Sequence, residues 1–347
     1  MRRRILGGDL QLLKSGRPIK TLKDKGSHML VSDTPMGKVH RYTVRVGNDD
    51  YVIETGKLAE QAGGAVTVQV GETVVFATAT MSKTAREGTD FFPLSVEYEE
   101  KLYAAGRIPG SYFRREGRPS EGAILIARLI DRPLRPLFSE DMRNDVQVVM
   151  SAFSHDQEHQ VDMPGMLAAS AAIMISDIPW NGPVAGVRIG MIDGELVVNP
   201  TIQQLENSVL DLRVAGTEFA INMVECAAHE VSEEVMIRAL RLAHDSIQPL
   251  IQVQKQMQAE IGKPKSAYIS QKIDSALQET IAEKTRARIR EVLVSTNDRT
   301  ERSNAIDAIR SEVVAQYEAA NAADGAVPVK INDVKNAVEN VYYEEVR

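Results

Sequence analysis

The hydrophobic pattern of this chain changes once, at the Gly-Lys-Pro-Lys tetrapeptide of residues 262–265, and this change is the strongest constraint on the fold. Before it, short runs of alternating apolar and polar residues are separated by turn residues, which is typical of strands. After it, Ala, Glu, Lys, Gln and Arg recur at helical spacing without a β-rich segment. The pattern predicts an α+β domain over residues 35–250 and an all-α domain over residues 265–347.

Hairpins are predicted wherever two strand-like runs flank a short turn. Residues 42–46 and 51–54 flank Asn-Asp-Asp, and residues 65–70 and 73–78 flank Gly-Glu. A third hairpin is expected to turn at Asp193-Gly194. Further strands are expected at residues 146–150, 210–214 and 219–224.

Two helix starts are predicted from capping serines, and one helix end is predicted from a proline. Ser120 is the expected N-cap of a helix that Pro133 should end at Arg132, because a proline disfavours helical geometry in the preceding residue. A buried helix of small residues is expected over residues 163–175, and a long helix is expected to begin near Ser232.

Residues 1–34 show no sustained periodicity, and we interpret them as an N-terminal extension, either a tag or a grafted segment. The Gly-Ser-His-Met sequence at 26–29 resembles a cloning scar. Cys226 is the single cysteine, which excludes an internal disulfide, fits a reducing compartment and is expected to be a small buried residue. With no apolar run long enough for a membrane span and no signal peptide, we expect a cytoplasmic protein.

Residues 112–135 concentrate six arginines and two aromatic residues in a chain whose net charge is -7. Guanidinium groups pair with phosphate oxygens, and aromatic rings stack on bases without reading their sequence, so the segment favours single-stranded RNA or DNA as a partner. The alternative is a solvated face whose arginines pair with acids such as Glu116, Glu121 and Asp131.

Other motifs give weaker signals. His155 and His159 are four apart, but they lie in a polar run that favours a surface loop over a zinc site. The sequence has no Walker loop, dinucleotide fingerprint or nucleophile elbow, so the residues alone identify no complete catalytic centre.

The segment YAAGRIPGSYFRREGRPSEGAILIARLIDRPLRPLF, residues 103–138, resembles the bacterial-type polynucleotide phosphorylases. The resemblance extends through DFFPLSVEYEE (90–100), IPWNGPVAGVRIG (178–190) and LDLRVAGTEFAINMVE (210–225), and it covers roughly residues 40–347. It implies a ribonuclease PH-like fold (ribosomal protein S5 domain 2-like) followed by a helical domain, as the N-terminal half of a homotrimeric ring enzyme. That enzyme would degrade mRNA from the 3′ end with inorganic phosphate, releasing nucleoside diphosphates reversibly, and would associate with partners in an RNA-degradation assembly.

The resemblance also implies roles for individual residues. A channel for single-stranded RNA is expected to be formed by Tyr112, Phe113, Arg114, Arg115 and Arg118. The 3′-terminal phosphates are expected to meet Arg128, Arg132 and Arg135 in a supporting catalytic role.

The family's Mg²⁺ site lies in a second ribonuclease PH-like unit, and the resemblance implies that the unit in this chain is the non-catalytic one. The position of the serine-rich phosphate loop reads Pro164-Gly165-Met166 here. Asp211 remains at one carboxylate position, but Arg213 replaces the lysine and Leu205 stands where a second aspartate is expected. No metal site is therefore expected in this chain.

Two other functions stay open at this point. One is a non-catalytic RNA-binding ring subunit of an exosome-like assembly, and the other is an independent enzyme that binds a small phosphate compound through Arg128–Arg135.

Overall fold

The computed structural model describes residues 21–24, 27–34, 37–85, 89, 91–108, 110, 117–322 and 328–347. This part of the chain forms two compact units. The larger unit runs to Tyr268 and contains both β-sheets, whereas the smaller comprises Ile269–Arg347 and two short earlier segments. The combination of sheets and helices confirms the predicted α+β class.

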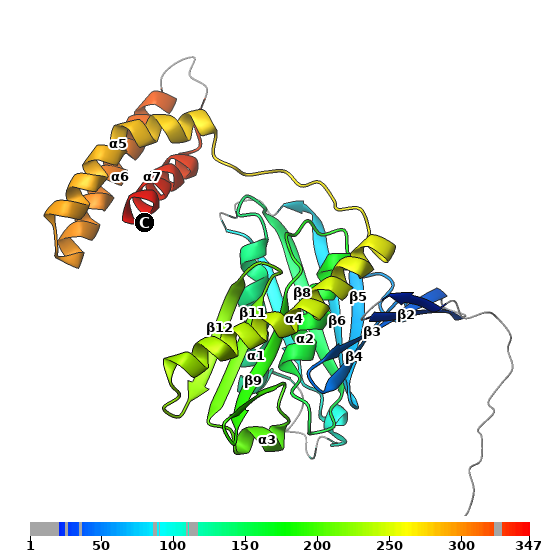
Figure 1. Cartoon of the computed structure of the whole chain (residues 1–347). Coiled ribbons are helices and arrows are strands. Elements are labelled where there is room, and N and C mark those ends of the chain that lie inside the picture. Colours follow the sequence, from blue (N-terminus) through cyan, green and yellow to red (C-terminus); the bar gives the residue numbers. More distant parts are fainter. Residues whose placement is uncertain are drawn as a thin grey trace, which may run out of the picture. The chain divides into compact units, whose positions relative to one another are not determined.

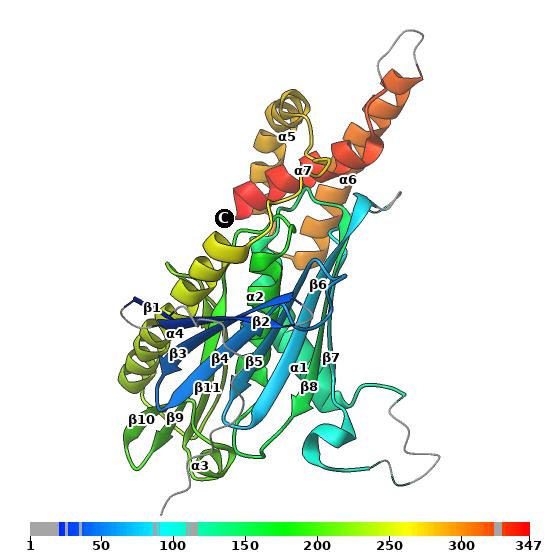
Figure 2. The same ribbon diagram turned by 90° about the vertical axis from the view of Figure 1, so that its right-hand side faces the viewer.

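The first sheet has eight strands in the order β1-β2-β3-β4-β5-β6-β8-β7 (Figure 2). Strand β7 pairs with β8 in parallel, whereas consecutive strands from β1 to β6 pair antiparallel. The strands are β1 (Thr21–Asp24), β2 (Ser27–Thr34), β3 (Gly37–Val46), β4 (Asp49–Thr55), β5 (Gly64–Val70), β6 (Thr73–Ala85), β7 (Leu94–Glu99) and β8 (Asn144–Ser154).

The two predicted hairpins at this sheet are confirmed as β3–β4 and β5–β6. Each turn contains a glycine in the left-handed region, Gly47 with φ +59° and Gly71 with φ +56°, where a side chain would strain the backbone. Along β5, buried and half-buried residues alternate, so that Val66, Val68 and Val70 all face the core.

The second sheet has four antiparallel strands in the order β10-β9-β11-β12. The predicted turn at Asp193-Gly194 joins the first two, which confirms the third hairpin. The strands are β9 (Ala185–Ile192), β10 (Glu195–Val198), β11 (Leu210–Gly216) and β12 (Ile221–Ala228).

Helices connect and cover the sheets of the larger unit (Figure 1). The helix predicted at 163–175 is α2, every residue of which is buried, and it packs against β5 and β8 of one sheet and β9 of the other. Helix α4 begins after the predicted N-cap Ser232 and packs on β3, β9 and β11. The elements are η1 (Leu102–Ala105), α1 (Glu121–Leu134), η3 (Arg135–Leu137), α2 (Asp162–Ile175), α3 (Ile202–Glu206) and α4 (Glu233–Ile261).

Residues 27–34, which show no sustained periodicity in the sequence, form strand β2, because backbone pairing with β3 does not require a hydrophobic pattern. Two expectations from the sequence are wrong. Helix α1 continues through Pro133 to Leu134, where burial of both side chains outweighs the local cost of the proline. Cys226 is exposed, because it lies on edge strand β12, beyond the strands β9 and β11 that α4 covers.

A strap, residues 262–268, follows α4 and is bound to the larger unit. The Lys265 ammonium group donates to the carbonyl oxygens of Ile173 (3.0 Å), Met174 (3.0 Å) and Ser176 (2.9 Å) at the end of α2. The Ser266 amide donates to the Asp177 carbonyl at 2.7 Å. Because the last carbonyls of a helix have no partners within it, Lys265 acts as a C-terminal cap for α2.

The smaller unit contains α5 (Ser275–Ser295), α6 (Arg299–Asn321) and α7 (Ile331–Val346). Asp274 and Asp298 accept hydrogen bonds from backbone amides as N-caps of α5 and α6. A small apolar core that includes Ile281, Ile289 and Val338 holds the three helices together. None of the helices in the described parts of the chain is both long and apolar enough to cross a membrane.

Candidate functional site

Two of the sequence-predicted arginines line one pocket of the larger unit. Ser120 accepts a hydrogen bond from the Ala123 amide and starts α1 as predicted. Arg128 and Arg132 follow one helical turn apart, and both line a pocket of about 510 Å³. The two side chains therefore lie on the same face of α1. The other side of the pocket is formed by β9, β11, β12 and the start of α2.

Strand register brings charged side chains together on the floor of this pocket, which Arg188, Arg213 and Glu225 line, and directly beside it, where Asp211 lies. Arg188 on β9 lies directly opposite Arg213 on β11, which in turn lies opposite Glu225 on β12. Asp211 is two residues from Arg213, so both side chains leave the same face of β11. Asp162 reaches the same floor from the first turn of α2.

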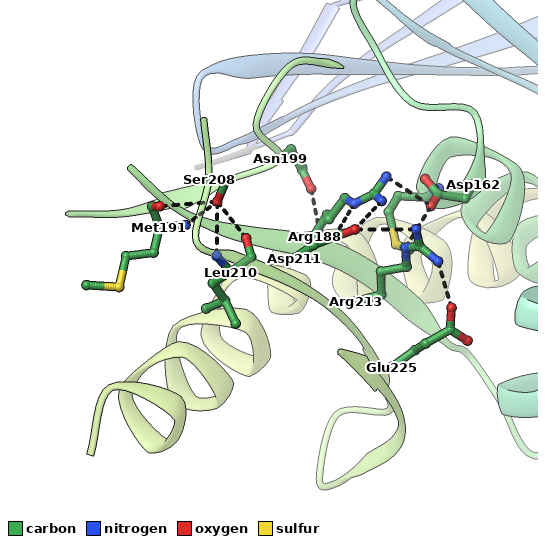
Figure 3. A network of polar contacts seen from close by, with 10 residues as sticks. Asp162, Arg188, Met191, Asn199, Ser208, Leu210, Asp211, Arg213 and Glu225 are labelled. Atoms are coloured by element: carbon green, nitrogen blue, oxygen red, sulfur yellow. Dashed lines mark hydrogen bonds and ion pairs between the residues drawn. The ribbon is translucent and has the colours of Figure 1, made fainter. Parts of the chain in front are cut away.

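These charges form a continuous network of ion pairs (Figure 3). Arg188 donates two hydrogen bonds to Asp211, at 2.5 and 2.7 Å, and lies 3.5 Å from Asp162. Arg213 donates to Glu225 at 2.6 Å and to Asp211 at 3.5 Å. The other oxygen of Glu225 accepts from Arg132 at 3.0 Å. Three carboxylates are thus balanced by three guanidinium groups.

The network keeps the floor of the pocket ionised. Burial alone would raise the pKa of Asp211, but the hydrogen bonds from Arg188 and the charges of Arg188 and Arg213 hold it below its ordinary value. Arg188 is only 6% exposed, and its pKa is raised because its contacts with Asp211 and Asp162 outweigh the effect of burial. A buried charge needs this pairing, since an unpaired one costs several kcal/mol.

The three predicted arginines of α1 and η3 differ in how they are held. Arg135 makes a bidentate pair with Asp131 at 2.7 and 3.0 Å and also donates to the Leu94 carbonyl. Arg132 donates a hydrogen bond to Glu225, which also accepts one from Arg213 on the floor of the pocket. Arg128 lines the same pocket without an ion pair to another described residue. Of the three, Arg128 is the guanidinium group best placed to receive an anion.

The pocket does not fit a magnesium ion. Mg²⁺ binds carboxylates that carry free negative charge. Here Asp162, Asp211 and Glu225 already face arginines. Within the described residues, no three His, Cys, Asp or Glu side chains are arranged to hold a metal.

Part of the predicted RNA channel cannot be placed. Tyr112, Phe113, Arg114 and Arg115 lie outside the described residues. Arg118 is described and exposed, two residues before the N-cap of α1.

The two histidines considered for zinc lie in a loop, as predicted. Asp156 accepts hydrogen bonds from the amides of Glu158 and His159 and from Thr73 on β6, so it ties the loop to the sheet. His159 contacts Asp156 at 2.7 Å, whereas His155 approaches the His159 carbonyl at 3.2 Å. These hydrogen bonds of His155 and His159 therefore stabilise the conformation of the loop.

Arg188, Asp162 and Glu225 were not singled out by sequence reasoning. The available signal was an isolated arginine within the apolar run AGVRIGMI, because a charge inside a buried strand needs a partner. The partner could not be identified, since Asp211 and Asp162 are 23 and 26 residues away and meet Arg188 only through strand pairing and helix packing.

Comparisons with known proteins show to which family the chain belongs. Residues 50–179 match the 3′ exoribonuclease family, domain 1, and residues 182–246 match the same family, domain 2. A polyribonucleotide nucleotidyltransferase of Thermomicrobium roseum is 50% identical over 279 residues, covering 80% of this chain and 35% of that protein. Its counterpart in Geobacillus kaustophilus is 45% identical over 306 residues, covering 88% and 42%.

The chain spans less than half the length of these curated relatives. A solved structure of Rrp46 from rice covers 62% of this chain at a TM-score of 0.47 and 12% identity, a likeness too distant to support an inference. The two family matches together extend over most of the larger unit, including the second sheet, strands β5 to β8 of the first sheet and the arginine-lined pocket. On this evidence, the chain belongs to the 3′ exoribonuclease family.

Proposed function

We propose that this chain is the N-terminal half of a phosphorolytic 3′-to-5′ exoribonuclease. The relatives named polyribonucleotide nucleotidyltransferase support this reading, since they match 80–88% of the chain. The observation that carries it here is Arg128, a guanidinium group without an ion pair to another described residue, in a pocket of about 510 Å³.

In the proposed reaction, an oxygen of inorganic phosphate attacks the phosphorus of the last phosphodiester of RNA. A new P–O bond forms, the bond to the 3′ oxygen of the preceding nucleotide breaks, and that oxygen takes up a proton. The products are a nucleoside diphosphate and an RNA one nucleotide shorter. The reaction reverses readily because one phosphoric ester linkage is exchanged for a diphosphate linkage.

The contribution of this chain is to bind and orient the RNA. Arg128 and Arg132 would hold the 3′-terminal phosphates and offset the charge that builds up when two anions meet. Arg135, held by Asp131 and Leu94, would support the turn that follows α1. Tyr112, Phe113, Arg114, Arg115 and Arg118 would guide the single strand towards them.

In this proposal, the metal ion that the reaction needs is bound outside this chain. Mg²⁺ would be bound by a second ribonuclease PH-like unit of the longer protein, where it would neutralise charge between the two phosphates. Pairing of Asp162, Asp211 and Glu225 with arginines supports a non-catalytic role for the unit in this chain. The same pairing is equally compatible with the alternative of a non-catalytic RNA-binding ring subunit. A homotrimeric assembly in the cytoplasm is part of the main proposal.

A binding experiment tests the role of Arg128. Fluorescence anisotropy with a labelled 20-nucleotide oligo(A) RNA should show weak, salt-sensitive binding to the chain. Arg128→Gln should lower the affinity about fivefold or more, since it removes a phosphate contact. Arg238→Gln, which removes an equal charge from the exposed face of α4, is the matched control. Equal affinities for the two variants would contradict the role of Arg128.

An activity measurement tests where the chemistry lies. The purified chain should release no nucleoside diphosphate from RNA, phosphate and Mg²⁺. Release at a steady rate would overturn the assignment of catalysis to a second unit. The main proposal predicts release when the complete second unit is added, whereas a ring subunit without chemistry predicts none.

A further inference from the structure

A second pocket of the larger unit, of about 460 Å³, is lined by Arg118, one of the predicted RNA-binding residues. It is formed by the end of β7, by η1, by the end of β8 and by the residues just before α1. Arg107 and Arg118 line it on either side of residues 108–117 in the sequence. Its volume is within the range of about 300–1,000 Å³ that is usual for small-molecule pockets.

The lining combines an apolar surface with exposed cations. Leu102, Ala104, Ala152 and Val161 supply apolar side chains, and Ala152 is 4% exposed. The His155 amide donates to the Ala104 carbonyl at 2.9 Å, which holds η1 against the end of β8. The apolar part of the pocket is therefore built on fixed secondary structure.

The acids of this pocket are already engaged. Lys101 lies 3.0 Å from Glu99, and Ser120 donates to Glu100 at 2.7 Å. Arg107 and Arg118, by contrast, are exposed and have no ion pair to another residue in the described ranges. Arg107 and Arg118 are therefore the cations of this pocket that can bind a ligand. Arginines pair with phosphate oxygens through two parallel hydrogen bonds.

We infer that this pocket is a subsite for an internal nucleotide of the RNA strand. One base would lie on the apolar surface around Leu102 and Ala104, and the phosphates on either side of it would meet Arg107 and Arg118. The inference rests on the proposed RNA-binding function and deepens it. It assigns RNA contacts to Leu102, Ala104 and Arg107, away from the pocket that contains Arg128.

Two variants separate the base contact from the phosphate contact. Ala104→Phe fills the pocket without changing charge, and Arg107→Gln removes one cation from an exposed position. Each should weaken binding of a 20-nucleotide oligo(A) RNA about fivefold or more, because base contacts and phosphate contacts both contribute at this scale. Arg238→Gln should leave the affinity unchanged, and circular dichroism checks that all variants are folded.

An abasic strand of the same length sharpens the test. Ala104→Phe should leave its affinity unchanged, since no base is available for the pocket, whereas Arg107→Gln should still weaken it. If the unaltered chain does not bind oligo(A), the proposed function and the subsite both fall. If it binds but neither Ala104→Phe nor Arg107→Gln weakens binding, only the subsite is wrong. If Ala104→Phe weakens both strands equally, the base contact is wrong.

Discussion

Arginine meets carboxylate in both units of this molecule, but in opposite surroundings. In the larger unit, the Arg188 side chain is 7% exposed and lies between Asp211 and Asp162. In the smaller unit, Arg288 pairs with Glu312 across α5 and α6 at 2.6 Å, with side chains 45% and 50% exposed. Water screens the second pair, whereas the side chains of Arg188 and Asp162 are almost fully shielded from it.

The difference in solvent exposure indicates how much each ion pair contributes to stability. The exposed pair adds little to stability, because its charges are well solvated whether or not they meet. The buried pair cannot lose one partner without leaving a charge in a dry environment. It also holds β9, β11 and the start of α2 in the positions that form the floor of the pocket. We therefore expect the structural requirements of the site to be concentrated in Arg188 and its partners.

The largest effect is expected from Arg188→Ala. The change leaves Asp211 and Asp162 without their main cation, so the free energy of unfolding should fall by about 3–5 kcal/mol. Urea denaturation at pH 7 measures this fall, with Arg238→Ala as an exposed control. A loss no larger than that of the control would show that the buried pair is not required for the fold.

The next effect is expected from Lys265→Met in the strap. The carbonyl oxygens of Ile173, Met174 and Ser176 lose the ammonium donor, although Ile173 still accepts from the Ser176 hydroxyl, so the free energy of unfolding should fall by about 1–3 kcal/mol. Burial lowers the pKa of Lys265 to about 8, with Asp177 opposing the shift, so most of the side chains are still charged at pH 7. Hydrogen exchange should accelerate at the Lys263 and Ser266 amides, which bond to Ile175 and Asp177.

The exposed Lys272→Met serves as the control for this variant. Unchanged exchange rates at Lys263 and Ser266 in the Lys265→Met protein would mean that the strap is held by its other contacts.

A pH dependence should follow from Asp211. Its folded pKa is lower than the unfolded value of 3.8, so its stabilising contribution is complete above that value and is lost as the pH falls through the folded pKa. Thermal melts between pH 5 and about pH 2 should show a smaller decline for Asp211→Asn than for the unaltered chain. Parallel declines in the two proteins would exclude Asp211 as a source of acid sensitivity.

The smallest effect is expected at the surface of the smaller unit. Arg288→Ala, Glu312→Ala and the double variant should all melt close to the unaltered chain, because the pair is solvent-exposed. Any coupling that a double-mutant cycle detects should disappear in 1 M salt. If the coupling persists at this salt concentration, solvent does not screen the Arg288–Glu312 pair, and the two sets of ion pairs do not differ in the way described above.

Several parts of the fold can be predicted from residues that are close together in the sequence. Ser120 and Ser232 were recognised as N-caps because a serine before an amphipathic run satisfies backbone amides within three residues. The turn at Asp193-Gly194 followed from glycine's tolerance of positive φ, which is +84° at Gly194. Predictions that depended on distant packing were less successful. Pro133 stays helical and Cys226 is exposed because neighbouring elements decide burial and helix ends.

The sequence by itself determined three hairpins and several of the helices, the change to an all-helical region after residue 265, and the gathering of arginines in residues 112–135. These features depend on periodicity, capping and local composition, which act within a few residues. Only the tertiary structure decided which arginines have partners. Arg188 meets Asp211 and Asp162, and Arg132 meets Glu225, because sheet register and the buried helix α2 bring them together. Charge pairing depends on distances of a few ångströms between elements that are far apart in the chain, and no local pattern records those distances.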